Sequence, residues 1–279
     1  MLPRARFRRA GEGQPQLSRR RRKVRALTGQ EAAGGHLAKV PAITLGFWVI
    51  KILATTLGET GADLFTQQYD MGYLAGIGLF VLPLIVLVIA QIRAARFHPL
   101  LYWATILAST TAGTALADFF DRSLGIGYAG GASVLLVGVL LALASWKAIL
   151  GTVAVDSVKT PSAEAFYWLT ITLSQTLGTA LGDWAADDGG LGYLGGAMVF
   201  GGLLFGLYLL YAQTRVSRVL LFWAAFILTR PLGATVGDFL DKPLTSGGLG
   251  FGRDTASIVL VLGIALALWW FPQKAAKAS

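Results

Sequence analysis

The chain has 279 residues, of which 54% are hydrophobic and 14% are charged, and its net charge is +9. A soluble protein of this size carries about 25% charged residues, so the composition excludes an ordinary soluble domain and indicates a membrane protein. With no cysteine and two histidines, the chain cannot form disulfides, thiolate metal sites or a cysteine nucleophile, and a Ser-His-Asp triad is disfavoured.

The N-terminal 40 residues hold 11 of the 24 basic residues. This segment is too long and too basic for an ordinary signal peptide. We expect residues 1–40 to form a disordered cytoplasmic arm, either a plain solvated tail or a segment that binds anionic lipid or nucleic acid. The rest of the chain is close to neutral, so the net charge does not indicate a nucleic-acid-binding fold.

Eight stretches of mostly apolar residues follow the arm. Each is close to the length of about 20 residues that a helix needs to cross a bilayer. They are residues 42–62, 73–92, 99–118, 128–147, 164–183, 193–212, 218–238 and 255–272. The sequence therefore predicts an all-α membrane fold with eight transmembrane helices.

The connections between these helices alternate in charge. The arm, the 93–98, 147–163 and 213–218 connections and the C-terminal tail together hold 19 of the 24 basic residues. Because positively charged connections stay in the cytoplasm, we expect both termini on the cytoplasmic side of the membrane. Aromatic residues near the cytoplasmic starts of the odd-numbered helices are expected to form an interfacial belt: Tyr102, Trp103, Tyr167, Trp168, Phe222 and Trp223.

A fourfold internal repeat runs through the membrane region. A tryptophan recurs near the start of every odd-numbered helix, a glycine follows it by ten residues and an aspartate by fifteen. The four sets are Trp48, Gly58 and Asp63; Trp103, Gly113 and Asp118; Trp168, Gly178 and Asp183; and Trp223, Gly233 and Asp238. We therefore divide the chain after the arm into repeats at 41–97, 98–160, 161–216 and 217–273 and a cytoplasmic tail at 274–279.

Each repeat contains two spans, so all four repeats enter the membrane in the same direction. Parallel repeats of this kind are related by an axis along the membrane normal. They can form a pseudo-fourfold bundle or a pair of two-repeat halves. Over about residues 42–272, the sequence resembles a family of bacterial multi-pass membrane proteins with four tandem two-helix repeats and a characteristic tryptophan in each. The resemblance implies this architecture and no activity.

One face of each odd-numbered helix carries a polar stripe. Counting from the third residue after each tryptophan, steps of four residues stay on one helix face. The stripes are Lys51, Thr55, Glu59, Asp63; Ile106, Thr110, Thr114, Asp118; Ile171, Gln175, Thr179, Asp183; and Phe226, Arg230, Ala234, Asp238. Because lipid rejects polar side chains, we expect the stripes to converge inside the bundle.

Three ionisable residues, Lys51, Glu59 and Arg230, lie deepest in the predicted membrane region, and each occurs in one repeat only. Arg230 lies one helical turn below Glu59 in the repeat frame, so we predict an ion pair between them. Such a pair would be either a gate or a structural pair that fixes the order of the repeats. The four repeat aspartates would either coordinate a cation, or bond backbone groups in the outer turns or face water there.

The leading hypothesis is a transporter for a hard cation, either a divalent metal or a proton-coupled ion. With oxygen ligands only, the four repeat aspartates are the candidate metal ligands. The predicted path is lined by Asp63, Asp118, Asp183, Asp238, Glu59, Arg230, Lys51, Gln175, Thr110, Thr114 and Thr179.

Two alternatives remain open. One is a permease for a small organic solute, in which Lys51 or Arg230 binds a carboxylate or phosphate. The other is a non-transport scaffold or a subunit of a membrane complex. We expect no enzymatic activity, no cofactor and no nucleic-acid partner. The expected partners are the lipid bilayer and a small cation or solute, with homo-oligomerisation left open.

Overall fold

The computed structural model describes residues 37–277, so most of the predicted arm, residues 1–36, lies outside the described residues. Within that range, eight long helices each overlap one predicted span. They are α2 (Leu45–Asp63), α3 (Tyr73–Arg93), α4 (Pro99–Asp118), α5 (Tyr128–Leu150), α6 (Pro161–Asp183), α7 (Gly192–Gln213), α8 (Arg218–Asp241) and α9 (Arg253–Trp270). The chain thus builds four successive helix pairs.

Helices α2, α4, α6 and α8 start at sequence signals that favour a helix N-terminus. The hydroxyls of Thr44, Thr160 and Ser217 accept hydrogen bonds from backbone amides in the first turns of α2, α6 and α8. Pro99 and Pro161 occupy the first turns of α4 and α6, where a missing amide hydrogen has no cost. These caps fix where each helix begins.

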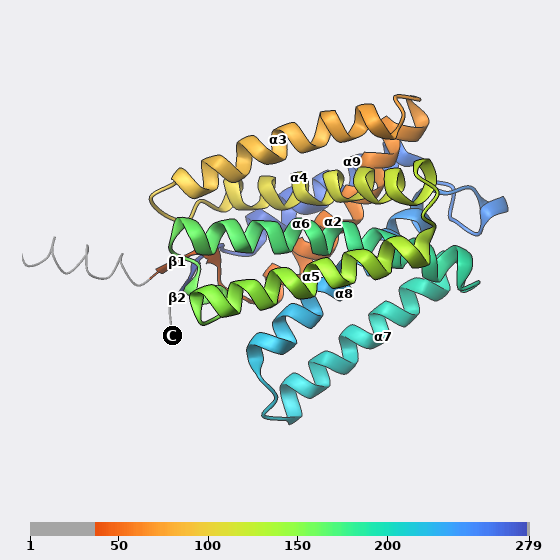
Figure 1. The fold of residues 1–279 in the computed structure, drawn as a ribbon. Coiled ribbons are helices and arrows are strands. Elements are labelled where there is room, and N and C mark those ends of the chain that lie inside the picture. The colour runs from red at the N-terminus through yellow and green to blue at the C-terminus, as the bar shows by residue number, and fades with distance from the viewer. Residues whose placement is uncertain (1–36, 278–279) are drawn as a thin grey trace, which may run out of the picture.

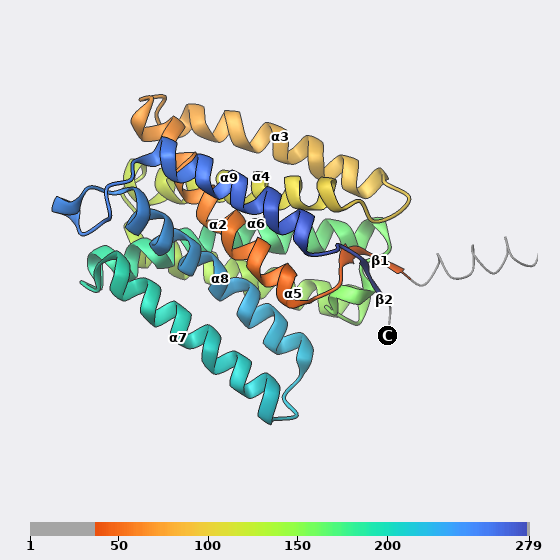
Figure 2. The same cartoon turned by 180° about the vertical axis from the view of Figure 1, so that it is seen from behind.

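The first helices of the four pairs are α2, α4, α6 and α8, which correspond to the odd-numbered predicted helices. They form a closed inner ring, in which α2 contacts α4, α4 contacts α6, α6 contacts α8 and α8 contacts α2. The second helices of the pairs, α3, α5, α7 and α9, lie outside this ring (Figures 1 and 2). Helix α3 packs on α4, α5 on α6, α7 on α8 and α9 on α2. The second helix of each pair therefore covers the first helix of the next pair, and the pairs interlock around the ring.

The repeat glycines lie where neighbouring inner helices approach most closely. Each faces the residue seven positions after the tryptophan of the next repeat: Gly58 faces Thr110, Gly113 faces Gln175, Gly178 faces Arg230 and Gly233 faces Thr55. A Cβ atom at any of the four would lie closer than 3.0 Å to its neighbour. The glycines are thus explained by close helix packing, as in other membrane bundles.

Six of the eight helices are long and apolar enough to cross a membrane: α3, α4 with the turn that follows it, α5, α7, α8 and α9. Helices α2 and α6 do not meet that test on their own. Helix α2 carries Lys51, Glu59 and Asp63, and α6 is rich in threonine and serine. These two helices have most of their polar residues buried against the other helices of the ring.

A small sheet joins the two ends of the described chain. Strand β1 (Leu37–Pro41) pairs antiparallel with β2 (Ala275–Lys277) at one end of the bundle (Figures 1 and 2). Residues 37–40 were expected to belong to the disordered arm, and this part of the prediction is wrong. Ala38 and Val40 are buried in the core, and Lys39 Nζ lies 2.7 Å from Glu164 Oε1, so these residues have partners that local sequence does not reveal.

At the opposite end, three of the inner helices continue into a single π-helical turn directly after the repeat aspartate. The turns are η1 (Leu64–Gln68), η2 (Phe119–Ser123) and η4 (Trp184–Asp188). The fourth repeat has a three-residue insertion, and there α8 runs on to Asp241, followed by a 3-10 turn, η5 (Leu244–Ser246). A further 3-10 turn, η3 (Val155–Ser157), lies in the α5–α6 connection. Such π turns are frequent at functional sites.

Candidate functional site

The ring axis begins, at the end that holds β1 and β2, with eight aromatic residues that we call the aromatic collar. They are Phe47, Trp48, Tyr102, Trp103, Tyr167, Trp168, Phe222 and Trp223. Six of them were predicted to form an aromatic belt at the membrane interface, and that prediction is wrong because these six side chains are at most 6% exposed. They lie in the first turns of the inner helices but point into the ring, where neighbouring helices cover them.

The collar is cyclic. The aromatic residue before each repeat tryptophan contacts the tryptophan of the next repeat, with ring-centroid distances of 5.5 Å for Phe47–Trp103, 5.6 Å for Tyr102–Trp168, 6.2 Å for Tyr167–Trp223 and 5.9 Å for Phe222–Trp48. The hydroxyls of Tyr102 and Tyr167 also share a hydrogen bond of 2.6 Å. Packed aromatic rings therefore close this end of the axis.

Deeper along the axis, one arginine joins all four inner helices. Arg230 Nη2 on α8 lies within hydrogen-bond distance of three oxygens: Glu59 Oε2 on α2 at 2.8 Å, Thr114 Oγ1 on α4 at 2.5 Å and Thr179 Oγ1 on α6 at 2.6 Å. All four side chains are buried, and we call this group the arginine clasp. The predicted Glu59–Arg230 ion pair is confirmed.

The repeat frame explains why the arginine can reach so far. Glu59, Thr114 and Thr179 each stand eleven residues after their tryptophan, and the equivalent position on α8 is Ala234. The backbone of Arg230 lies one helical turn before Ala234 on α8. Its guanidinium can therefore occupy the space beside the small Ala234 side chain. A charged hydrogen bond in such a buried place is strong, and losing one partner leaves an uncompensated charge.

Between the collar and the clasp lies a set of buried groups that we call the donor layer: Lys51, Thr110, Gln175 and the Nε atom of Arg230. Lys51, Thr110 and Gln175 are fully buried. Among residues 37–277, no hydrogen-bond partner is found for Lys51 Nζ, Thr110 Oγ1, either amide atom of Gln175, or Arg230 Nε. Lys51 Nζ instead lies 3.8 Å from the centroid of the Phe226 ring.

Beyond the clasp the axis opens into an acidic region, the carboxylate end. Six carboxylates here are at most 7% exposed: Asp63, Asp118, Asp121, Asp183, Asp238 and Asp241. Three basic residues face them. Arg122 lies 3.3 Å from Asp118 and 3.7 Å from Asp183. Lys242 lies 3.0 Å from Asp63 and 3.1 Å from Asp238, and Arg253 reaches Asp63 and Asp241, both at 3.4 Å.

The bridging lysine stays charged because of these carboxylates. Burial lowers the pKa of the Lys242 ammonium, but Asp238 and Asp63 outweigh burial and raise it well above the usual lysine value. Six carboxyl groups against three basic groups nevertheless leave an excess of acidic groups at this end. Of the described atoms, Asp63 Oδ1, Asp118 Oδ2 and both Asp121 oxygens find no hydrogen-bond donor.

The structure does not gather the four repeat aspartates around one ion, which corrects the metal site predicted from the sequence. Arg122 bridges Asp118 and Asp183 on one side of the ring, and Lys242 bridges Asp63 and Asp238 on the other. Within the described range, the acids close enough to share an ion are Glu59, Asp63 and Asp238, with one ligand oxygen from each within 4.8 Å of the others.

The other interpretation, that the aspartates bond backbone groups in the outer turns or face water there, also fails for three of them, which are buried. The Asp63, Asp118 and Asp183 side chains make no hydrogen bond to the π turns that they precede. The basic partners Arg122 and Lys242 were not among the predicted site residues, although each stands four residues after a repeat aspartate. That spacing is the usual signal of an ion pair along a helix and could have found both.

The family pattern described as Repeat of Unknown Function (DUF347) matches residues 46–97, 101–153, 166–217 and 221–275. The chain belongs to this family. Each DUF347 repeat contains one inner and one outer helix, so the four tandem repeats read from the tryptophan spacing are confirmed. No curated protein and no solved structure matches the chain.

The DUF347 repeats share some axial residues and differ in others. All four contribute two residues to the collar, one close-packing glycine and one terminal aspartate. Lys51, Glu59 and Arg230 each occur in a single DUF347 repeat. The shared residues therefore build the symmetric ring, and the unique charges make its interior asymmetric.

Proposed function

We propose that this protein is an integral membrane transporter that spans a bacterial inner membrane eight times and moves a hard cation along the axis of the inner ring. In this proposal the carboxylate end faces outward, the collar faces the cytoplasm and the arginine clasp is the closed gate between them. The protein acts without catalysis and without a cofactor.

The outer helices support membrane insertion. Large aliphatic and aromatic side chains of α3, α5, α7 and α9 are exposed, including Leu82, Val134, Phe205 and Trp269. Side chains of this kind are stable against lipid and unfavourable against water. Helices α2 and α6 cross as well in this proposal, because the ring shields their polar residues from hydrocarbon.

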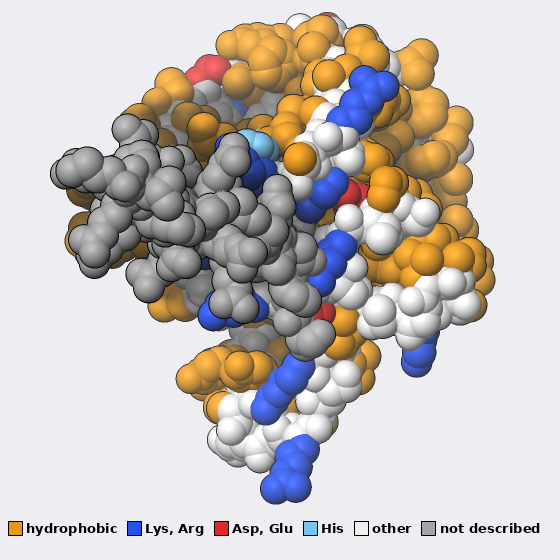
Figure 3. All heavy atoms as spheres, turned by 90° about the vertical axis from the view of Figure 1, so that its left-hand side faces the viewer, with side chains coloured by type: hydrophobic (Ala, Val, Ile, Leu, Met, Phe, Trp, Pro, Cys, Tyr) orange, Lys and Arg blue, Asp and Glu red, His pale blue; other side chains and the backbone are white. Residues whose placement is uncertain are grey.

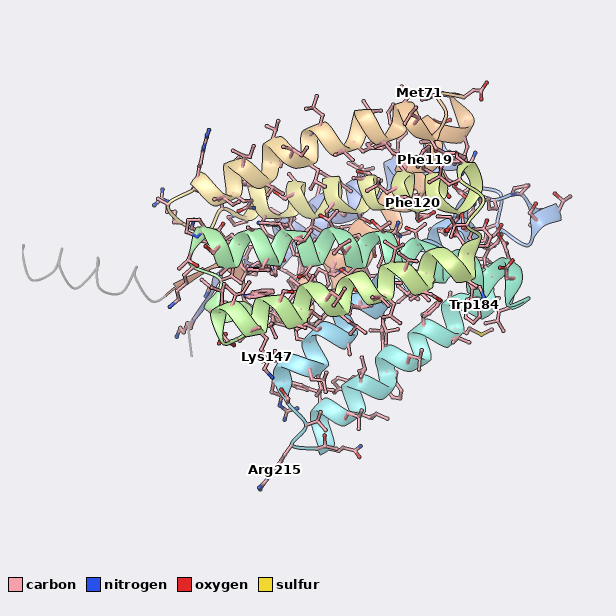
Figure 4. All side chains as sticks on the ribbon, in the orientation of Figure 1. Met71, Phe119, Phe120, Lys147, Trp184 and Arg215 are labelled. Atoms are coloured by element: carbon pink, nitrogen blue, oxygen red, sulfur yellow. The ribbon has the colours of Figure 1, made fainter. Side chains whose placement is uncertain are left out.

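Charge at the two ends supports the orientation. The end that carries β1, β2 and the α3–α4, α5–α6 and α7–α8 connections bears nine basic residues of the described range: Lys39, Arg93, Arg96, Lys147, Lys159, Arg215, Arg218, Lys274 and Lys277. Figure 3 shows basic side chains spread over this face. Figure 4 places Arg215 at this end and Met71, Phe119 and Trp184 at the opposite one. A basic face of this kind belongs in the cytoplasm.

The observation that carries the transport proposal is the meeting of six buried carboxylates with three basic groups at one mouth of the ring. Buried carboxylates need positive charge or protons to remain stable. An excess of carboxylates over bases therefore attracts cations to this mouth. Oxygen ligands from Glu59, Asp63 and Asp238 favour Mg²⁺, Mn²⁺ or protons over soft metals.

The clasp suggests how ion binding would open the path. Arg230 and Lys242 occupy the same carboxylates that an ion would need, since Arg230 pairs with Glu59 and Lys242 with Asp63 and Asp238. A divalent ion at these oxygens competes with both side chains. Displacing Arg230 from Glu59 removes one of the links between α8 and α2, and in this proposal the inner helices then separate.

The test is flux of Mn²⁺, Mg²⁺ and protons into liposomes that contain the purified protein. Wild type is expected to move at least one of these ions down a gradient. Glu59→Gln and the double change Asp118→Asn with Asp183→Asn are expected to abolish or strongly reduce that flux. Asp188→Asn removes an exposed carboxylate at the same end and serves as the matched control. Absence of flux in wild type, or equal flux in all variants, would contradict the proposal.

A second candidate, a permease for a small organic solute, is favoured by one specific observation. Lys51 places a fully buried ammonium on the path without an acidic partner among the described residues. A path for cations alone does not need a buried basic side chain such as that of Lys51.

A further inference from the structure

Lys51 is the one buried basic group of the axis for which the described residues supply neither an ion pair nor a hydrogen bond. Its side chain is fully buried on α2, and its Nζ lies 3.8 Å from the centroid of the Phe226 ring. A single aromatic face offsets only part of the desolvation of an ammonium group. Glu59, the nearest acid along the same helix face, already accepts from Arg230.

The other unpartnered groups of this region are mostly hydrogen-bond donors. Thr110 Oγ1, Gln175 Nε2 and Arg230 Nε join Lys51 Nζ, whereas the Gln175 Oε1 atom is the one obligate acceptor without a partner in the donor layer. These residues stand three and seven positions after their tryptophans, which places them on successive helical turns about 6 Å apart. Hydrogen-bond donors from α2, α4, α6 and α8 thus outnumber the acceptors along this stretch of the axis.

The same stretch is closed on both sides. The collar covers it toward β1 and β2, and the clasp covers it toward the carboxylate end. Its apolar walls are Ile106, Ile171 and Phe226, all fully buried. A group bound here would be small, enclosed and separated from the outer carboxylates by the guanidinium of Arg230.

We propose that the donor layer binds a small monovalent anion, either a halide or a carboxylate of one or two carbons, as a second substrate beside the cation. The anion would accept from Lys51 Nζ, Thr110 Oγ1 and Gln175 Nε2, and it would neutralise the lysine. This inference rests on the proposed function in taking the ring axis as the substrate path. The donor excess and the basic Lys51 side chain select an anion, and the apolar walls select a small one.

The experiment is anion binding to the purified full-length protein by calorimetry and thermal unfolding. Sodium chloride, formate and acetate are compared with sodium gluconate, a large anion, at equal ionic strength. At least one small anion is expected to raise Tm above the gluconate value. Lys51→Met is expected to weaken its binding about tenfold to hundredfold, because a hydrogen bond to a charged group is lost. Lys147→Met, the same change at an exposed lysine, is expected to leave binding intact.

Lys51→Met removes a buried amine that has no hydrogen-bond partner among the described residues, so it should fold at least as well as wild type. Thr110→Val, which deletes one donor at nearly constant volume, is a second test variant. Its loss of anion affinity is expected to be smaller than that of Lys51→Met. The inference is overturned if no small anion binds in preference to gluconate, or if Lys51→Met binds as tightly as wild type. Binding without cation flux would overturn the proposed function and leave the anion site standing; cation flux without anion binding would do the reverse.

Discussion

Arg230 of the fourth repeat donates to Glu59 of the first repeat at 2.8 Å, and the bond joins the two ends of the repeat series inside the ring. Both side chains are buried, and the same guanidinium nitrogen also reaches Thr114 and Thr179. One residue therefore ties the four inner helices together at a single level.

Removing one partner of the Glu59–Arg230 pair should lower the free energy of unfolding strongly. Removing both partners should lower it much less than the two single changes added together. Arg230→Met leaves a buried carboxylate without its cation, and Glu59→Met leaves a buried guanidinium without its anion. Each single change is expected to lower the free energy of unfolding by about 3–5 kcal/mol, and the double change by much less than the sum. Denaturant titration of the four proteins measures this cycle; additive losses would mean that the two side chains do not interact.

The close helix packing at the repeat glycines can be tested where backbone faces backbone. In Gly113→Ala, the new Cβ would lie 2.9 Å from the backbone nitrogen of Thr176, which cannot rotate away. Forcing α4 and α6 apart is expected to cost about 1–3 kcal/mol of unfolding free energy. Gly78→Ala, on the outer face of α3 with nothing within 4 Å, is the control and should be neutral or slightly stabilising. Equal losses at both positions would refute the packing account.

The absence of cysteine makes the orientation easy to test, because any introduced thiol is the sole reactive one. Arg215→Cys and Asp188→Cys each replace an exposed residue, at opposite ends of the bundle. A membrane-impermeant maleimide added to intact spheroplasts should label position 188 and spare position 215 until the cells are permeabilised. Labelling of both positions in intact spheroplasts, or the reverse order, contradicts the proposed topology.

The Lys242 bridge should persist into alkaline conditions. Its pKa in the folded protein is raised above the unfolded value, so its contribution to stability is complete below the unfolded pKa and is lost only as pH rises through the higher folded pKa. Lys242→Arg carries a charge at every relevant pH and serves as the reference. Between about pH 8 and about pH 10, the Tm difference between the two proteins should stay constant. A wild type that loses Tm relative to Lys242→Arg over this range would disprove the raised pKa.

Local periodicity was enough to predict part of this structure. Helix positions follow from apolar runs, and the Glu59–Arg230 pair follows from the repeat frame, since residues one turn apart on facing helices can reach each other. The convergence of polar stripes follows from the exclusion of polar groups by lipid. These inferences require only the spacing along the chain and the low polarity of hydrocarbon.

Other features depend on contacts between distant parts of the chain. Aromatic residues at a helix start suit both a lipid interface and a ring interior, so sequence alone could not assign Tyr102 or Trp223 to the collar. Strand β1 exists because residues 275–277, at the far end of the chain, pair with it. The bridging of Asp63 by Lys242 and Arg253 likewise joins the first repeat to the fourth.

The measurement that most directly tests whether the inner ring forms a conducting path is thiol labelling at the clasp during transport. Thr114→Cys places a thiol on the buried face of α4, and Thr111→Cys places one on another face of the same helix. In liposomes with a Mn²⁺ gradient, a small cationic methanethiosulfonate should modify position 114, spare position 111 and block flux through the modified protein. If position 114 stays unmodified while Mn²⁺ flows, the ions take another route and the account of the axis is wrong.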